Sequence, residues 1–508
     1  MGQNRPVSFR SALFLSALTL AAAALRGWGL TDFAITHWDE GLVWRGAQYF
    51  LTLAQEGHYS PTHGPPLVSA GMAALARLAG RDPAVAVLWN LVLGSGLVPL
   101  SYWVGCRIAS ARVGWVAAVL IAASGLHLVF ARSLLTETTY AFFLLASLGL
   151  SATALERPRP VWLLATGLAV ACTQATKYNG FLAAAPLAIL LTVRFARAPE
   201  GGIALFALRL ALLCAPAALV IAGNLAAIAA MADLSAFIEH YAGYVGSAAP
   251  PLEILGTLAF VLPWTVLALV PLGLLHGGAA RERLWLLHLT LALYALFLFR
   301  YAFFLRLMVP VATLLILYAA LGIDALAGRL ATRWRPAHWV VSIGLIGLAL
   351  LQTGLRWERF FISRFDGYSS ASAFLVDPVQ SAGDRARLIA GQDFVWEELG
   401  GEAPVFGLPS QGASAILATS REVDLIVDVG AFSRLRPWDL EPIFEELRER
   451  YLLERFPATL NLDALQNNLT LGELQRLGTD EALRERVLWI HIFRLPSREL
   501  ERLVAERL

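Results

Sequence analysis

The sequence predicts a polytopic α-helical membrane protein with an α/β domain at its C-terminal end. The first observation is composition: 57% of the 508 residues are hydrophobic and 15% are charged, whereas about a quarter of a soluble globular chain is charged. The second is a series of apolar runs over residues 1–356, and the third is a change at about Trp357, after which the chain becomes charged and mixed. A net charge of +2 gives no indication of a nucleic-acid partner.

About eleven apolar runs have a length near that needed to cross a bilayer as a helix, although the fifth and sixth are short. Pro66–Ala79 is shorter and carries Arg77, so we interpret it as a helix lying along the membrane surface. The spans are predicted at about Ser11–Leu30, Ala84–Gly105, Val113–Phe130, Thr138–Leu155, Val161–Thr176, Phe181–Val193, Leu205–Met231, Leu252–Leu275, Leu284–Phe299, Leu307–Leu326 and Trp339–Leu355.

The first run has an alternative interpretation as a cleaved signal peptide, because it combines a positive flank, an apolar core and small residues. Its core is long, the stretch from Arg26 to Trp28 is a poor cleavage context, and ten further runs follow. These features favour a retained first span.

The arginine pattern predicts the orientation, because basic loops stay in the cytoplasm. With the N-terminus inside, every inside loop is basic: Arg5 and Arg10, then Arg107 and Arg112, Arg157 and Arg159, Arg194, Arg197 and Arg209, Arg281 and Arg283, and Arg329, Arg333 and Arg335. Eleven spans then place the first outer loop, residues 31–83, and the tail, residues 357–508, on the extracytoplasmic side. The expected location is the plasma (inner) membrane.

The tail is predicted to be a soluble α/β domain. Strands are expected at 403–408, 423–430 and 488–495, where β-branched and aromatic residues gather. Amphipathic helices are expected at 442–456 and 469–487. The stretch "GLPSQGAS" at 407–414 lacks a phosphate-loop pattern and is interpreted as a turn.

Several cations break the inside-positive pattern by lying at predicted outer helix ends or in outer loops. They are Arg45, Arg132, Arg300, Arg306 and Lys177, the only lysine of the chain. Each one alone has the alternative of snorkelling to lipid headgroups. Together they share a side with carboxylates and a histidine, namely Asp39, Glu40, Glu137, Glu239 and His240. A rim of this kind suits group transfer from a lipid phosphate, with cations stabilising the leaving phosphate and a carboxylate taking the acceptor's proton.

The order of several motifs resembles the GT-C superfamily of membrane glycosyltransferases, in particular protein O-mannosyltransferases and the aminoarabinose transferase of lipid A. The motifs are "DEGLVWRGAQYFLTLAQEGHYSPTHGPPLVSAGMAAL", "ARSLLTETTYAFF", "ATKYNGF", "SAFIEHYAGYV" and "RYAFFLRLMVPVATLLILY". The resemblance covers about Ser11–Leu355. It implies a polyprenyl-phosphate-sugar donor and an acceptor that is a lipid, a glycan or a protein, with inversion at the sugar.

The resemblance, together with the charged and aromatic residues predicted at the outer side, gives expected roles for individual residues. Asp39 maps onto the family's presumed base, with Glu40 beside it. Lys177, Arg132, Arg300 and Arg306, the last two followed by Pro310, are expected to bind the donor phosphate. His63, Glu137, Tyr49, Glu239 and His240 are expected to line the sugar or acceptor site. The sequence departs from the lipid A enzyme at His63, where that enzyme has a lysine before the loop's proline.

Each assignment has a structural alternative. Asp39 also suits the start of a surface helix, and Glu137 can pair with Arg132 five residues earlier. Glu239 and His240 also fit a solvated loop, and Tyr49 fits an interfacial aromatic belt. No cofactor is required in this interpretation, although Asp39, Glu40 and Glu137 leave a divalent metal open. The three cysteines, all within apolar runs, show no metal-ligand spacing.

Two competing functions remain from the sequence. A transporter or flippase of lipid-linked saccharides would predict inverted repeats and polar residues in mid-span, and neither is clear in the chain. A non-catalytic receptor or scaffold would leave the acidic pair and the outer cations without a role.

Overall fold

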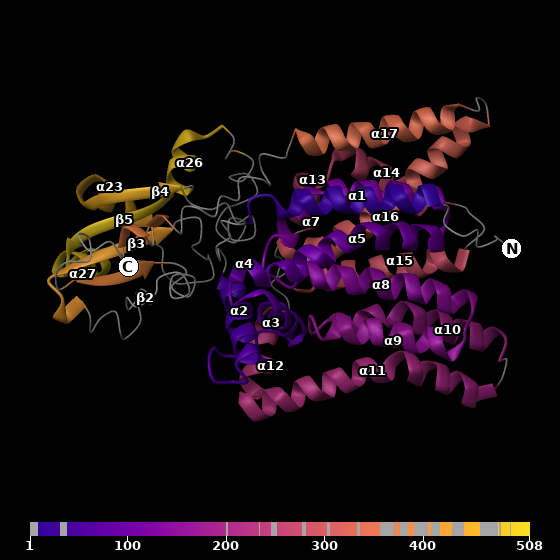
Figure 1. Cartoon of the computed structure of the whole chain (residues 1–508), viewed down its shortest axis with the longest axis horizontal. Helices are drawn as coiled ribbons and strands as arrows, with labels where there is room; N and C mark the ends of the chain where they lie inside the picture. The colour runs from indigo at the N-terminus through magenta and orange to yellow at the C-terminus, as the bar shows by residue number, and fades with distance from the viewer. Residues whose placement is uncertain are drawn as a thin grey trace. The chain divides into compact units, whose positions relative to one another are not determined.

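The computed structural model contains two compact units (Figure 1). One comprises Met1–Trp28 and Arg45–Trp357, and the other comprises Gly29–Trp44 and Glu358–Leu508. The structure describes residues 9–30, 38–199, 202–232, 234–244, 251–276, 281–301, 305–332, 336–355, 370–371, 373–375, 385–390, 405–407, 417–428, 441–457, 476, 479–487 and 489–507.

Each predicted apolar run is helical in the first unit. Five helical segments are long and apolar enough to cross a membrane: α1 (Phe9–Gly27), Pro83–Ile108, α8 (Glu137–Glu156), α11 (Gly202–Met231) and Leu305–Ala331. Counting two bent pairs as single spans gives up to seven in the described part of the chain. The remaining runs form α9 (Pro160–Gln174), α10 (Ala185–Arg197), α15 (Arg281–Leu298) and α17 (Ala337–Gly354). The total of eleven spans therefore stays a prediction.

Two runs predicted as single spans are bent. Leu252–Leu275 forms α13 (Pro251–Val261) and α14 (Trp264–Leu274), which meet at 116°. Pro263 stands at the break, where its ring and missing N–H prevent a continuous helix.

The second bend, of 60°, separates α6 (Ala111–Ala123) from α7 (Gly125–Ala131). Ser124 is extended there, and its backbone N–H donates to Ile121 O over 3.3 Å. The buried Arg26 guanidinium of α1 donates to the same oxygen over 3.2 Å, so a second helix also satisfies the end of α6.

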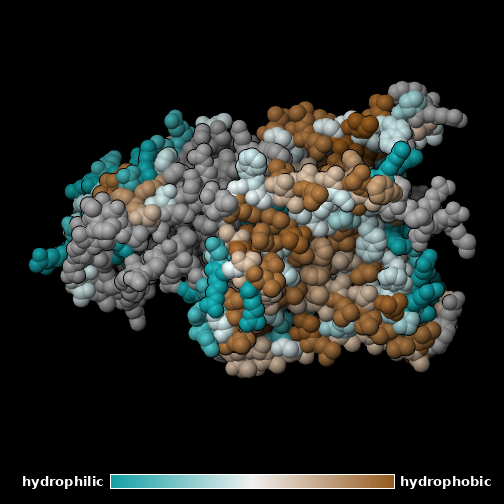
Figure 2. Space-filling model, in the orientation of Figure 1, coloured by the Kyte–Doolittle hydropathy of each residue, from teal (hydrophilic) through white to brown (hydrophobic). Residues whose placement is uncertain are grey.

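Burial separates the core helices from those that face lipid. In α16 (Met308–Ala331), which packs on α14, α6 and α8, most side chains are buried. In α11, by contrast, large apolar side chains such as Ile203 and Leu219 are about three-quarters exposed (75% and 74%). Hydrophobic side chains cover the flank of the long helices and hydrophilic ones gather toward their ends (Figure 2). This is the pattern of a helical bundle embedded in lipid.

Short helices lie at one end of the long ones (Figure 1). The apolar segment predicted to lie along the membrane surface is α3 (Leu67–Ala79), which buries Val68, Met72 and Ala76 on one face. It packs on α4 (Pro83–Ala86) and α5 (Leu88–Ile108). α12 (Leu234–Tyr244) continues from the same end of α11. α2 (Trp38–Leu51) carries the acidic pair in its first turn.

The second unit contains a mixed five-stranded sheet with strand order β2-β1-β3-β5-β4. The parallel strands are β1 (Arg385–Ala390), β2 (Val405–Gly407) and β3 (Glu422–Asp428), while β4 (Leu452–Pro457) and β5 (Trp489–Pro496) run antiparallel to their neighbours.

The prediction of one helix at 442–456 is wrong in its second part. The helix α23 (Glu441–Tyr451) ends before β4, because Leu452–Pro457 pairs with β5. Of the helix predicted at 469–487, α26 (Glu481–Val487) is present, and much of the remainder, like most of the turn at 407–414, lies outside the described residues.

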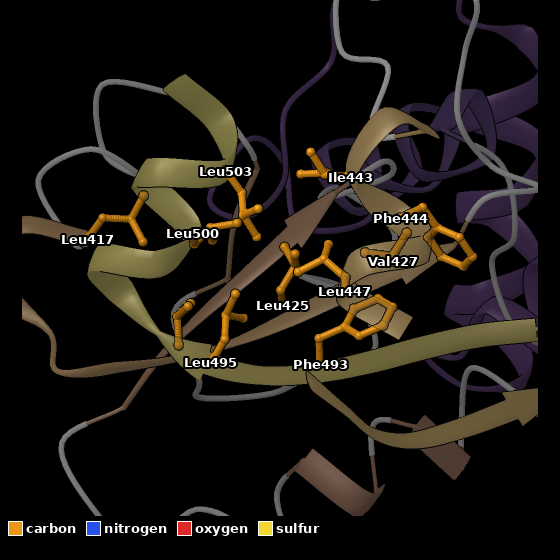
Figure 3. Packing of buried hydrophobic residues seen from close by; sticks show 11 residues of the cluster. Leu417, Leu425, Val427, Ile443, Phe444, Leu447, Phe493, Leu495, Leu500 and Leu503 are labelled. Atoms are coloured by element: carbon orange, nitrogen blue, oxygen red, sulfur yellow. The ribbon is translucent and has the colours of Figure 1, made fainter. Parts of the chain in front are cut away.

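The core of this unit lies between the sheet and its helices (Figure 3). Leu425 and Val427 of β3 and Phe493 of β5 pack against α23 and α27 (Ser497–Arg507). α23 contributes Ile443, Phe444 and Leu447, and α27 contributes Leu500 and Leu503. β1 and α27 were not predicted from the sequence.

Candidate functional site

Lys177 lies in a tight turn that follows α9. Its backbone N–H still donates to Thr173 O over 3.1 Å, and its carbonyl accepts from Gly180 N over 2.9 Å. A Cβ at position 180 would lie 2.3 Å from the backbone nitrogen of Gln174, so only glycine fits there. The Gln174 side chain accepts from the backbone N–H of Phe181 over 2.9 Å. The turn therefore holds the lysine on a firmly bonded backbone.

Glu137 begins α8, after a turn that the buried Asn90 of α5 anchors. The Asn90 amide donates to Ser133 O over 2.7 Å and to Leu135 O over 2.6 Å. Its carbonyl oxygen accepts from Thr139 Oγ1 over 2.8 Å. A carboxylate in the first turn of a helix is favoured by the helix dipole.

The two turns bring Lys177 and Glu137 together. Lys177 Nζ lies 2.5 Å from Glu137 Oε1, with 19% of the lysine side chain and 2% of the glutamate side chain exposed. Glu137 Oε2 is buried and has no hydrogen-bond partner among the described residues. The sequence left open an ion pair between Glu137 and Arg132. In the structure, Glu137 instead pairs with Lys177.

A small pocket opens beside this ion pair, and its lining includes both polar and apolar side chains. The residues come from α8, the turn after α9, α15, the short 3₁₀ helix Leu305–Leu307 and the start of α16. Two of the lining residues, Tyr140 and Tyr294, are hydrogen-bonded to each other through their hydroxyls. The lining residues are Glu137, Tyr140, Lys177, Asn179, Tyr294, Phe297, Leu298, Leu307 and Pro310. The lining thus brings a cation, hydroxyl groups and apolar side chains together at one small opening.

The first outer loop is attached to the same turn. The Tyr178 hydroxyl donates to Pro61 O, and the Tyr241 hydroxyl of α12 donates to Thr62 O over 3.2 Å. The Leu67 N–H, at the start of α3, donates to Ala175 O over 3.0 Å. Loop residues next to His63 are thereby held beside the segment that carries Lys177.

The acidic pair lies in the part of α2 that belongs to the second unit. Asp39 is half-buried and Glu40 is 1% exposed. Both lie in the first helical turn, where a carboxylate is favourable. The helix start predicted for "WDEGL" is therefore present.

Apart from Glu137 on α8, the predicted sugar or acceptor residues lie on two helices and a loop. Tyr49 of α2 is half-buried, with its ring centroid 6.2 Å from that of Tyr59. His63 is exposed, and its Nδ1 lies 2.9 Å from Ser60 Oγ. Glu239 is exposed on α12, and the His240 side chain lies outside the described residues.

The predicted phosphate-binding arginines occupy three different positions. Arg132 is buried at the end of α7, at the start of the turn that leads to Glu137. Arg300 is exposed directly after α15, and Arg306 lies half-buried in the short 3₁₀ helix Leu305–Leu307. Among the predicted site residues, Lys177 and Glu137 are brought into direct contact as an ion pair. Arg45, which the sequence also placed at the outer rim, is half-buried on α2.

Six lining residues were not predicted from the sequence: Tyr140, Asn179, Tyr294, Phe297, Leu298 and Leu307. Tyr140 follows Glu137 by three residues and Asn179 follows Lys177 by two, so their place in the motifs was a usable signal. Tyr294 and Phe297 lie within the apolar run of α15, where no local pattern sets them apart. No group of three or more His, Cys, Asp or Glu side chains is placed to hold a metal ion in the described ranges.

Comparison with known proteins identifies the fold. A sequence model of the dolichyl-phosphate-mannose-protein mannosyltransferase family matches residues 84–222. The crystal structure of ArnT from Cupriavidus metallidurans in the apo state superposes with a TM-score of 0.57 at 13% identity, covering 89% of this chain and 97% of that one. The same enzyme bound to undecaprenyl phosphate gives 0.56 at 13% identity, over 89% and 96%.

A second kind of enzyme shares the fold. The Archaeoglobus fulgidus oligosaccharyltransferase, tethered with an acceptor peptide, gives a TM-score of 0.54 at 12% identity, covering 82% of this chain and 69% of that one. No curated protein matches the chain. The resemblance to the GT-C superfamily of membrane glycosyltransferases is thus confirmed, with the fold established over most of the chain. Together with its apolar helices, this fold makes the chain an integral membrane protein.

Proposed function

We propose that this protein is a glycosyltransferase that moves one sugar from a polyprenyl-phosphate donor to an acceptor at the outer face of the membrane. The observation that carries the proposal is the small pocket whose lining combines Lys177 with the apolar side chains of Phe297, Leu298 and Pro310. A polyprenyl phosphate has the matching character, because a charged head is followed by a hydrocarbon chain. The likeness to ArnT bound to undecaprenyl phosphate supports this ligand class.

Lys177 is the residue proposed to hold the donor phosphate. An ammonium is a compact point charge with three donors, which fits a single phosphate in a narrow pocket better than the planar guanidinium of arginine. Arg132, Arg300 and Arg306 are proposed to add positive potential around the leaving group. Cations fixed in advance stabilise the charge that grows on the phosphate in the transition state.

Asp39 is proposed as the general base. Its carboxylate takes the proton from an acceptor hydroxyl as the oxygen attacks the anomeric carbon from the face opposite the phosphate. The bond from that carbon to the phosphate oxygen breaks, its electron pair leaves with the polyprenyl phosphate, and the anomeric configuration inverts. Glu40 supports Asp39 from the same helical turn. His63, Tyr49, Glu239 and His240 are proposed for the sugar and acceptor side.

The proposed orientation places this chemistry outside the cytoplasm. The N-terminus is cytoplasmic, residues 1–356 form the transferase part in the plasma (inner) membrane, and residues 357–508 form an extracytoplasmic domain. In this arrangement a lipid-linked donor reaches the pocket from the bilayer, and a lipid, glycan or protein acceptor reaches it from outside.

The test is to incubate purified protein in lipid nanodiscs with a radiolabelled polyprenyl-phosphate sugar and a membrane extract. A transferase yields a labelled acceptor, whereas a flippase moves the donor without consuming it and a receptor does neither. Absence of any labelled acceptor, with donor intact, would reject the proposal. A parallel reaction with a chelator tests the metal: full turnover there supports a mechanism that requires none.

A further inference from the structure

We infer that Glu137 is a resident counter-ion of Lys177 that the donor phosphate displaces, so that Glu137 sets how tightly polyprenyl phosphate binds and how readily it leaves. This inference rests on the proposed function, because it assumes that the phosphate binds at Lys177. It assigns Glu137 a role toward the donor in place of the sugar or acceptor role expected from the sequence.

The first argument is that both anions would use the same ammonium group. Glu137 Oε1 already lies 2.5 Å from Lys177 Nζ, at the wall of the pocket that the donor head would enter. The glutamate is 2% exposed. Its other oxygen, Oε2, is buried without a hydrogen-bond partner among the described residues. Among the described residues, Lys177 is the cation with which this carboxylate forms an ion pair.

The second argument is electrostatic. A phosphate at Lys177 stands within a few ångströms of the Glu137 carboxylate, and like charges at about 4 Å repel by several kcal/mol near a protein surface. The phosphate therefore weakens the Lys177–Glu137 pair as it binds. By the same balance, the carboxylate weakens phosphate binding.

The third argument concerns the product. The donor is a phosphodiester with one negative charge, whereas the released polyprenyl phosphate is a monoester with about 1.5 to 2 charges at pH 7. Lys177 alone would hold the product more tightly than the donor. A carboxylate that returns to Lys177 after transfer offsets this difference and favours release.

The experiment measures binding of undecaprenyl phosphate to the full-length protein in nanodiscs. The variants are Glu137→Gln, which keeps the shape and removes the charge, and Glu137→Asp, which keeps the charge on a shorter side chain. Glu156→Gln is the matched control, because Glu156 ends the same helix and pairs with Arg107 and Arg283 at the opposite end. Lys177→Met reports loss of the cation.

The expected result is that Glu137→Gln binds undecaprenyl phosphate about tenfold more tightly or better, while Glu156→Gln binds like the wild type. Glu137→Asp should lie between wild type and Gln. Polyprenol, which lacks the phosphate, should bind all variants alike. At saturating donor, turnover of Glu137→Gln should fall as product release slows, and added undecaprenyl phosphate should inhibit it at lower concentration than the wild type.

Weaker binding in Glu137→Gln, matching the loss in Lys177→Met, would overturn the inference, because Glu137 would then only position the lysine. If Glu137→Gln does not fold, unchanged or weaker binding in Glu137→Asp overturns it. A wild-type protein that does not bind undecaprenyl phosphate at all would instead reject the proposed function. The two failures are therefore distinguishable.

Discussion

Lys177 Nζ and Glu137 Oε1, 40 residues apart in the chain, lie 2.5 Å from each other and join the end of α9 to the start of α8. Neither partner is fully solvated, and the glutamate is almost completely buried. Removing one member of such a pair leaves the other charge uncompensated, which costs about 3–5 kcal/mol when the pair is buried. Any functional test of Lys177 therefore needs a variant that separates binding from stability.

Lys177→Met is expected to lower thermal stability and to weaken donor affinity strongly. The double variant Lys177→Met with Glu137→Gln is expected to recover most of the stability, because no buried charge remains, but not the donor affinity. Lys177→Arg should restore affinity only in part, because the wide guanidinium does not match a narrow pocket. Thermal unfolding and donor binding are measured on the same preparations. A double variant that binds donor like the wild type would remove Lys177 from the phosphate site.

Asp39→Asn is expected to reduce transfer by about 10²–10⁴-fold while leaving the protein folded and donor binding unchanged. Asparagine keeps the volume of the side chain and a hydrogen-bond acceptor but does not take up the proton. The measurement is the single-turnover rate with bound donor and excess acceptor. Glu40→Gln is the comparison and should cost less. An equal loss at both positions would instead indicate a shared proton or a metal, and near-normal turnover in Asp39→Asn would exclude it as the base.

The sequence predicted the helical runs well because each apolar segment is long and its polar flanks are local signals. The sequence predicted one continuous span at Leu252–Leu275, whereas the structure has two helices that meet at 116° near Pro263. A proline alone does not predict such a bend, since proline is tolerated within many membrane helices. The site shows the same division. Lys177 stood out as the only lysine, whereas its pairing with Glu137 depends on how α8 and α9 pack, and Tyr294 reaches the pocket from α15 without any local pattern.

Gly322→Ala is expected to destabilise the helical unit by about 1–3 kcal/mol, the usual cost of overpacking. A Cβ at Gly322 of α16 would lie 2.2 Å from the backbone oxygen of Leu269 in α14, so the two helices would have to separate. Gly328→Ala in the same helix is the control, because a Cβ there has no neighbour within 4 Å. That variant should be neutral or up to about 1 kcal/mol more stable through helix propensity. Equal melting temperatures for the two variants would contradict the close crossing.

The second unit is expected to lose stability on acidification because of His491 in β5. This side chain is 1% exposed, and burial lowers its pKa from about 6.5 to about 4. The positive charges of Arg455 and Arg448 also lower this pKa, whereas the negative charge of Glu485 raises it. The unfolded chain therefore takes up the proton first. The contribution of neutral, buried His491 to the folding stability of this unit is complete above about pH 6.5. It is lost as the pH falls toward 4, and the total loss in the free energy of unfolding is about 3 kcal/mol.

The measurement is hydrogen exchange in β3 and β5 of the full-length protein at pH 7 and pH 5, corrected for intrinsic exchange. His491→Phe is the control, since the ring lies among Phe444 and Phe493, with centroids at 5.0 and 6.0 Å. Protection should fall at pH 5 in the wild type and change less in the variant. The same loss in both would assign the acid sensitivity to other groups.

Truncation after Trp357 is expected to abolish or strongly reduce transfer while leaving donor binding intact. The reason is that the Lys177 pocket belongs wholly to the unit formed by Met1–Trp28 and Arg45–Trp357, whereas Asp39 lies in Gly29–Trp44, which groups with Glu358–Leu508. Removing the tail takes away the surroundings of the proposed base but not those of the proposed phosphate site. Undecaprenyl phosphate binding and transfer to a simple acceptor are measured on the truncated protein, with full-length Asp39→Asn as the reference for loss of the base alone. Normal turnover of the truncated protein would make the tail an accessory for acceptor delivery, and loss of donor binding would show that the first unit does not form the pocket by itself.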